Sequence, residues 1–244
     1  MKLYIVRHAD PDYEHDTLTE KGWREAQLLA PRIAALPNAH FYVSPLGRAQ
    51  DTASCTLKLA KASAVTLPWL QEFNTGYTMD PAFNPRNYAW DLLPGDWADE
   101  PLCYDPQRWY EAPPYRGSGI DQRYRAVCDG LDLLLARHGY VRDGHIYRAE
   151  RPNRDAIVFF CHYGIECVLL SRLMDFSPVS LWQHTVALPS SVTVLATEER
   201  IPGTAVFRLS RFGDLSHLDA AGEPESFSAR FRETGDSTTE RADF

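Results

Sequence analysis

Short apolar runs alternate with stretches of helical periodicity along most of the chain. Runs of three to six strand-forming residues predict strands at Leu3–Val6, Phe41–Val43, Val65–Leu67 and Ala156–Cys161, the first and last of them buried. Apolar residues recur at helical spacing within 26–33, 48–60, 120–138 and 165–173. This alternation predicts an α/β protein, organised as a three-layer αβα sandwich around a mostly parallel central sheet.

Two local signals refine the first helix. Thr17 and Glu20 stand three residues apart, the spacing of a capping box, and predict the start of the helix there. Pro31 lies inside the helical pattern that follows. Because proline lacks the backbone N–H that a helix interior uses, Pro31 predicts a kink or an early break.

The end of the chain has the pattern of a hairpin followed by a tail. Val192–Leu195 and Val206–Leu209 are strand-like, and the turn residues Pro202 and Gly203 lie between them. Beyond Asp219 the chain is polar, and we expect this tail to fray.

The stretch from Asn74 to Gly117 lacks clear periodicity and holds seven prolines together with many aromatic residues. Long irregular stretches are uncommon in compact domains and are often lids or binding loops. Packing as a small aromatic subdomain explains the same composition, and the two roles are compatible. We interpret residues 77–117 as an insertion.

Length and charge narrow the class of protein. A chain of 244 residues forms one large domain, or a domain with a substantial insertion, and can bury a core of sufficient size. The net charge of −8 disfavours a general nucleic-acid binder, which needs a basic face. An anionic substrate is not excluded, because a pocket can be locally cationic within an acidic protein.

The cysteines and the hydropathy pattern predict the compartment. The five cysteines are scattered without a C-x-x-C pair, which is typical of reduced thiols in a reducing compartment. The four apolar residues before Arg7 are too few for the core of a signal peptide. No apolar run approaches the length of about 20 residues that spans a bilayer. We therefore expect a cytoplasmic protein that makes no use of a membrane.

Polar groups suited to phosphate follow three of the predicted strands. Arg7 and His8 end the first strand, Arg48 begins the helix after the second, and His162 follows the late strand. If these strands are parallel neighbours, their carboxyl ends bring the side chains into one crevice. Arginine matches phosphate oxygens with two parallel hydrogen bonds, and a helix N-terminus adds backbone donors. This pattern predicts an anion site that contains a nucleophile.

Two other chemistries compete with this interpretation. A metal could be held by the dense polar cluster of His8, Asp10, Asp12, His15 and Asp16. Arg7 beside that cluster would repel a cation, so residues 10–16 are better interpreted as a polar loop at the entrance to the site.

A thiol nucleophile is suggested by Cys161, which precedes His162. Alternation along the strand points these two side chains to opposite faces, which favours a buried structural cysteine.

Six ordered segments resemble the histidine phosphatase superfamily, whose fold is that of phosphoglycerate mutase. They are Val6–Ala9, Leu18–Gly22, Ser44–Ala53, Leu70–Gly76, His162–Gly164 and Gly213–Leu218. The resemblance implies a single domain over residues 1–220, with residues 77–117 inserted over the active site, and a polar tail over residues 221–244.

The resemblance also implies the roles of the site residues. His8 would attack phosphorus and form a phosphohistidine, and Glu72 would act as general acid and then as general base. A protonated His162 would complete the catalytic set. Arg7, Arg48 and Gly164 would bind the substrate. No metal or other cofactor is expected, since the arginines supply the positive charge.

The segments bear on which reaction the protein catalyses. Mutases of this superfamily would be expected to carry a Ser-x-Trp-Asn run after the first histidine, where this chain has Asp10–Glu14. We therefore expect a metal-independent phosphomonoesterase that acts on a small phosphorylated metabolite. The alternatives are a phosphotransferase of the phosphoglycerate mutase type, and a protein of the same fold that binds a phosphorylated ligand without turnover.

Two residues depart from the superfamily's usual pattern without removing a reacting group: Ala9 and Tyr163 replace glycines. The phenol of Tyr163 either lines the pocket or packs outward. The sequence does not predict the oligomeric state.

Overall fold

The computed structural model describes residues 1–228 and 234. Its main sheet consists of β1 (Lys2–Arg7), β4 (Ala39–Val43), β5 (Ala64–Thr66), β6 (Tyr140–Asp143), β7 (Ile146–Ala149), β8 (Ala156–Cys161), β9 (Val192–Ile201) and β10 (Thr204–Asp214). The strand order is β5-β4-β8-β1-β9-β10-β7-β6. A separate small ladder pairs β2 (Pro11–Asp12) with β3 (Thr17–Leu18).

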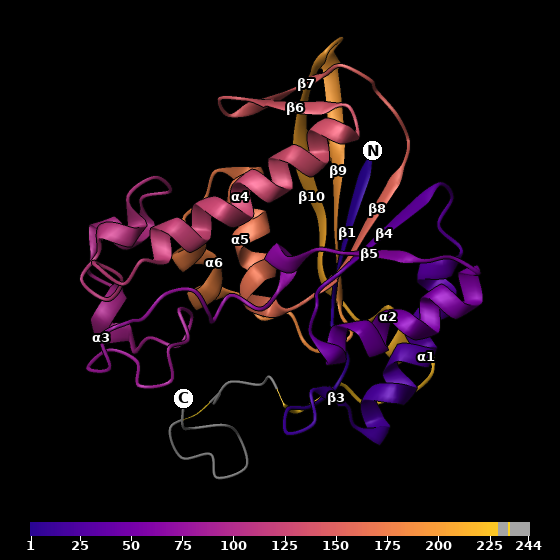
Figure 1. The fold of residues 1–244 in the computed structure, drawn as a ribbon, viewed down its shortest axis with the longest axis horizontal. Helices are drawn as coiled ribbons and strands as arrows, with labels where there is room; N and C mark the ends of the chain where they lie inside the picture. Colours follow the sequence, from indigo (N-terminus) through magenta and orange to yellow (C-terminus); the bar gives the residue numbers. More distant parts are fainter. Residues whose placement is uncertain (229–233, 235–244) are drawn as a thin grey trace.

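Helices cover both faces of the main sheet (Figure 1). The longer ones are α1 (Glu20–Ala34), α2 (Gly47–Ala60), α4 (Ile120–Arg137), α5 (Tyr163–Met174) and α6 (Pro178–His184). The shorter ones are α3 (Pro94–Trp97), α7 (Ser216–Asp219), η1 (Pro68–Leu70), η2 (Pro101–Tyr104) and η3 (Trp109–Glu111). In Figure 1, α1 and α2 lie on one side of the strands, and α4, α5 and α6 lie on the other. The predicted three-layer α/β fold is confirmed.

The sheet is mixed, so the expectation of a mostly parallel sheet holds for only half of it. β8 pairs in parallel with β1 and with β4, and β4 pairs in parallel with β5. From β1 outward through β9, β10, β7 and β6, every pairing is antiparallel. Two-residue connections, such as Pro202-Gly203 between β9 and β10, can join only antiparallel neighbours.

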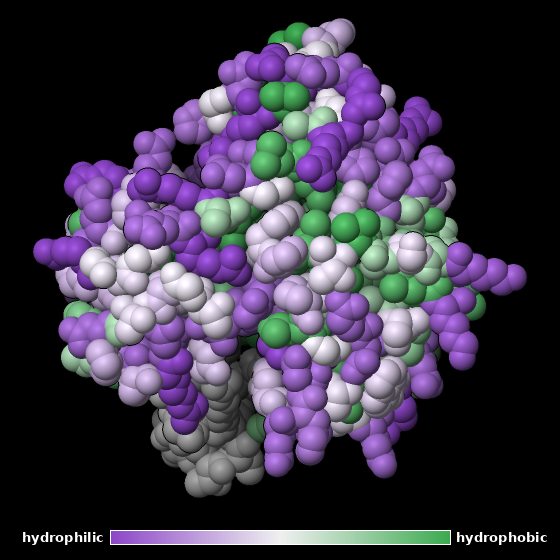
Figure 2. Space-filling model, in the orientation of Figure 1, coloured by the Kyte–Doolittle hydropathy of each residue, from purple (hydrophilic) through white to green (hydrophobic). Residues whose placement is uncertain are grey.

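Alternation along the central strands divides the apolar core into two layers. Leu3, Ile5 and Phe159 pack with α4 and α5, whereas Val6 and Phe160 pack with α1 and α2. Figure 2 shows hydrophilic residues over most of one outer face, with apolar residues gathered across its middle, over β4 and β5.

The insertion packs into the core layer that contains α4 and α5. Trp109 and Tyr115 are fully buried, and their rings lie edge-to-face at 5.2 Å between centroids. Trp109 also meets Trp182 of α6 edge-to-face at 5.5 Å. Part of the insertion therefore belongs to the main core, because its rings bury against α6 as well as against each other.

The first helix differs from its predicted ends. Its N-cap is Thr19, whose side chain accepts a hydrogen bond from the Gly22 N–H, and not Thr17. Thr17 pairs with Asp12 in the small ladder and donates its hydroxyl to Asp51, so it cannot cap the helix. Pro31 does not break the helix early. It falls in the last turn, and the helix continues to Ala34.

Several short elements were not predicted, and the tail does not fray where we expected. The β6–β7 hairpin and α6 went unrecognised because each is short and lacks periodicity. Glu223 pairs with Lys21 of α1 at 3.2 Å, and Ser226 is buried against Asp10. The first residues of the predicted 221–244 tail thus pack on the domain, and its remaining residues, apart from 234, lie outside the described part.

All five cysteines are unpaired. Within the described residues, no helix combines the length and the apolar character needed to cross a bilayer.

Gly22 tests how tightly α1 packs on the loop that precedes it. A Cβ at this position would lie 2.1 Å from the carbonyl oxygen of Asp10, whereas a Cβ at Gly95 would meet nothing within 4 Å. Gly22→Ala should lower the free energy of unfolding by about 1–3 kcal/mol, because overpacking outweighs a gain in helix propensity of about 1 kcal/mol. Gly95→Ala is the matched control and should change stability little. Denaturant unfolding that finds Gly22→Ala as stable as Gly95→Ala would contradict this packing.

Candidate active site

The carboxyl ends of three parallel strands lie side by side and carry the predicted site. β1 ends at Arg7 and is followed by His8, and β8 is followed by His162. The ladder continues past the strand ends, since the His8 N–H donates to the Cys161 carbonyl at 2.9 Å. The Ser44 N–H after β4 likewise donates to the Phe160 carbonyl at 2.9 Å. These bonds hold the residues after each strand in register.

His8 is buried and oriented by its own backbone. It is 1% exposed, and its Nδ1 lies 2.8 Å from the Ala9 carbonyl oxygen. A carbonyl only accepts, so Nδ1 carries the proton and Nε2 keeps its lone pair. Burial, followed by the charges of Arg7 and Arg48, lowers the pKa of His8 well below its usual range. His8 is therefore a neutral imidazole with Nε2 available as a nucleophile.

Arg7 and Arg48 supply two buried guanidinium groups, 8% and 9% exposed. Arg7 donates to the Ala187 carbonyl at 2.5 Å and stacks over the Tyr163 ring at 5.6 Å. Arg48 stacks over the Tyr13 ring at 5.4 Å. The Nε atoms of both arginines are buried and have no hydrogen-bond partner among the described residues. Buried donors of this kind favour the arrival of an anionic ligand.

His162 differs from the protonated residue that we expected. It is fully buried, and its ring lies 5.1 Å from that of His8. Burial, then His8, Arg48 and Arg7, lower the pKa of His162 well below its usual range, so the ring is neutral in this state. Its Nε2 lies 2.7 Å from the Ser44 hydroxyl. A bound phosphate dianion would favour its protonated form.

Glu72 is held at the N-terminus of α5. Its carboxylate accepts from the Phe73 N–H at 2.7 Å, the Ile165 N–H at 3.1 Å and the Gly164 N–H at 3.4 Å. Burial raises the pKa of Glu72 in spite of these donors and of the charges of Arg48 and Arg7. A carboxyl group with a raised pKa is suited to give up a proton and take it back.

Gly164 lets two groups approach the start of α5. A Cβ there would lie 2.2 Å from the Trp90 ring and 2.7 Å from Oε1 of Glu72. Its N–H donates to Glu72, so the expected substrate-binding role of Gly164 stays a prediction. Its visible role is to hold Glu72 and to leave room for Trp90.

The two arginines and Glu72 open into one pocket of about 680 Å³. Arg7, Arg48, Glu72 and Tyr163 line it together with Tyr13, Asn74, Arg86, Tyr88, Trp90 and Ser228. The insertion contributes Arg86, Tyr88 and Trp90, as expected of a segment that follows Glu72. Tyr163 lines this pocket, while its hydroxyl points away and donates to the Thr185 carbonyl at 2.6 Å. Both expectations for this residue therefore hold.

A model described as the histidine phosphatase superfamily (branch 1) matches residues 3–207. The chain belongs to the histidine phosphatase superfamily.

Curated relatives in this superfamily match a shorter part of the chain. Two proteins named "Probable phosphoglycerate mutase GpmB", from Cronobacter sakazakii and Yersinia pestis, are 32% and 33% identical over 85 residues. These matches cover 31% of this chain and 40% of each relative.

Solved structures share the fold at low identity. A mycobacterial glucosyl-3-phosphoglycerate phosphatase has a TM-score of 0.57 at 19% identity, covering 87% of this chain and 98% of that one. A phosphoserine phosphatase from Entamoeba histolytica has a TM-score of 0.57 at 16% identity, covering 89% and 98%. An α-ribazole phosphatase from Shigella flexneri has a TM-score of 0.54 at 19% identity, covering 88% and 97%. At this identity the likeness shows the fold alone.

Several residues of this histidine phosphatase-superfamily site were not predicted from the sequence. Asp16 accepts from the Gly47 N–H at 2.7 Å and from Arg48 at 2.5 Å, which caps α2 and orients the guanidinium. Ser44 bonds His162, and Ser228 reaches the pocket from the end of the described chain. Asp16 stood in the proposed polar loop, but no local pattern signals that it pairs with a residue 32 positions away.

The metal alternative for the entrance loop gains no support from these contacts. Asp16 is paired with Arg48, and Asp12 lies 2.8 Å from His15 Nδ1. Asp10 accepts from the hydroxyls of Thr19 and Ser226. Among the described residues these carboxylates serve the protein's own donors.

The late Gly213–Leu218 segment does not line this pocket. Asp214 pairs with Arg32 of α1 at 2.8 Å and accepts from the Ser216 N–H at 2.9 Å. His217 is buried and lies 3.2 Å from the Ser190 hydroxyl. This part of the superfamily pattern joins α7 to α1.

Glu166 is a buried carboxyl group near the site that sequence analysis did not select. It lies on α5, is 1% exposed, and has no described hydrogen-bond partner within normal geometry. Burial raises its pKa to about 7, although the Thr193 hydroxyl and the charge of Arg7 favour the ionised form.

Replacing Glu166 by glutamine should change how stability depends on pH. The folded-state pKa of about 7 exceeds the ordinary 4.5, so the wild type is stabilised by protonation below 4.5 and loses this stability as pH rises through 7. Glutamine resembles the protonated acid and does not titrate. The stability of Glu166→Gln relative to wild type should rise by roughly 2 kcal/mol between about pH 5 and about pH 8. Denaturant unfolding at both pH values measures this, and a difference independent of pH would contradict it.

Proposed function

We propose that this protein is a phosphomonoesterase that transfers the phosphoryl group of a small metabolite to His8 and then to water. The observation that carries the proposal is the state of His8. Its Nδ1 proton is held by the Ala9 carbonyl, its pKa is lowered, and two guanidinium groups flank it. Nucleophilic catalysis requires this unprotonated nitrogen, and the transferred oxygens require the nearby positive charge.

In the first step, Nε2 of His8 attacks phosphorus and the bond to the leaving oxygen breaks. Protonated Glu72 gives its proton to that oxygen, and the alcohol leaves. Arg7 and Arg48 bind the phosphoryl oxygens throughout the transfer, which relies on positioning and charge. His162 lies beside His8 and can share a proton with the same oxygens.

In the second step, water attacks the phosphohistidine while Glu72 takes up a proton. The N–P bond breaks, inorganic phosphate leaves, and His8 returns to its neutral form. The arginines supply the positive charge that this mechanism needs, so it calls for no metal. The organic part of the substrate would contact Tyr88 and Trp90, which stack on each other at 5.2 Å in the pocket wall.

A phosphotransferase of the mutase type is the second candidate, favoured by the names of the curated relatives. It uses the same first step and differs in the acceptor of the second. Incubation with 3-phosphoglycerate separates the two, because a phosphatase releases inorganic phosphate and a mutase forms 2-phosphoglycerate. A protein that only binds a phosphorylated ligand would do neither with any substrate.

His8→Ala tests the proposed nucleophile. With an aryl phosphate and a metal chelator, the wild type should turn over and His8→Ala should lose at least about 10³-fold in kcat. His15→Ala is the matched control, since His15 is an exposed histidine of the entrance loop. Equal activity of His8→Ala and wild type would exclude the mechanism, and loss of wild-type activity with chelator would favour a metal enzyme.

Glu72→Gln tests the general acid. Because kcat/KM depends on steps up to formation of the phosphoenzyme, it reports protonation of the leaving group and not the later hydrolysis. We expect a loss of about 10²–10⁴-fold with an alkyl phosphate and a much smaller loss with para-nitrophenyl phosphate, whose leaving group needs no proton. Equal losses on the two substrates would remove Glu72 as the acid.

A further inference from the structure

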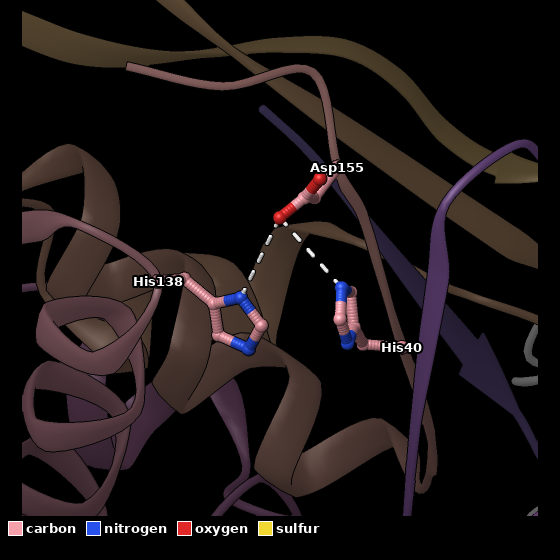
Figure 3. A group of neighbouring side chains, drawn as sticks. All are labelled: His40, His138 and Asp155. Atoms are coloured by element: carbon pink, nitrogen blue, oxygen red, sulfur yellow. Dashed lines mark ion pairs between the residues drawn. The ribbon is translucent and has the colours of Figure 1, made fainter. Parts of the chain in front are cut away.

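Three side chains of types that commonly bind metals meet at the end of the sheet opposite the active site. His40 lies near the start of β4, His138 caps the end of α4, and Asp155 immediately precedes β8. One ligand atom from each lies within 4.8 Å of the others, and no second such group of three is found among the described residues. Figure 3 shows a nitrogen of each ring directed at the same carboxylate oxygen.

The two distances from the Asp155 carboxylate are close to those expected around one zinc ion. Asp155 Oδ2 lies 3.6 Å from His40 Nε2 and 3.9 Å from His138 Nδ1. Tetrahedral zinc, bound at about 2.1 Å, places its ligand atoms about 3.4 Å apart. The two distances from Asp155 therefore exceed this spacing by only a few tenths of an ångström, and the two imidazole nitrogens lie within 4.8 Å of each other.

The surroundings prepare His138 as a ligand. Its Nε2 lies 2.8 Å from the Tyr42 hydroxyl, which can accept the ring proton and leave the Nδ1 lone pair directed at Asp155. The backbone of Asp155 is fixed, because its carbonyl accepts from the Lys2 N–H at 2.9 Å.

We propose that His40, His138 and Asp155 form a zinc site that joins β4, α4 and the start of β8. Two imidazoles and one carboxylate are ligands typical of zinc, and they do not suit magnesium or calcium. The His40 side chain is 48% exposed, which leaves the fourth position to water. Two positive charges disfavour the ion. The N-terminal amine of Met1 acts on Asp155, and Arg151 acts on His138.

The site lies far from the reaction centre. Asp155 and His162 stand at the two ends of β8, seven residues apart, which corresponds to about 23 Å along an extended strand. A metal there would not take part in phosphoryl transfer. Because it would bind the folded chain and not the unfolded one, it would raise the melting temperature.

Zinc titration of the chelator-treated full chain tests the proposal, with affinity read by competition against a chromophoric chelator and melting temperature as a second readout. The wild type should bind one equivalent and melt at a higher temperature with zinc. His40→Gln and His138→Gln should each weaken binding at least tenfold and lose the zinc-dependent rise in melting temperature. Tyr42→Phe should weaken it about tenfold through the lost partner of His138.

Two controls fix the location of the ion. His145→Gln removes an exposed histidine that lies 3.2 Å from Asp175, and His8→Ala removes an imidazole of the active site. Both should bind zinc as the wild type does. The proposal is overturned if the wild type shows no saturable binding, or if binding is lost in His8→Ala and kept in His138→Gln. Equal melting temperatures of zinc-free wild type and His40→Gln would show that the loss is not due to unfolding.

Discussion

Two backbone hydrogen bonds at the carboxyl end of β8 determine where the reacting groups lie. The His8 N–H donates to Cys161, and the Ser44 N–H donates to Phe160. These bonds extend the parallel ladder past the ends of β1 and β4, so that His8 and Ser44 follow in register beside His162. The site therefore depends on the central three strands being parallel. The segment that leads into β9 also holds the site, since the Ser190 N–H donates to the His8 carbonyl at 3.0 Å.

Burial then sets the chemistry of those groups. Removing charge from water lowers the pKa of both histidines and raises that of Glu72, which leaves neutral imidazoles beside a carboxyl group that holds its proton more tightly. The arginines stay charged, and part of their donor capacity is unused within the described protein. A phosphate dianion is the ligand that satisfies these donors while matching the charge of the site.

The local hydropathy pattern was enough to predict the strands that carry the site. The apolar runs before His8 and His162 are short and almost continuous, as expected of strands buried on both faces of a sheet. The order of motifs then predicted His8, Arg48, Glu72 and His162, which the fold brings together. Long-range pairing could not be predicted. Thr17 matches a capping pattern, but its hydroxyl donates to Asp51. Asp16 binds Arg48 across the site. The neutral state of His162 also follows from burial, which sequence does not report.

Trapping of the covalent intermediate tests the central claim most directly. Wild type and Glu72→Gln would be mixed with an aryl phosphate, quenched in alkali, where the N–P bond survives, and mapped by mass spectrometry. We predict one phosphoryl group on His8, with more accumulated in Glu72→Gln because activation of water is impaired. Turnover without phosphorylation of His8 in either protein would contradict the account.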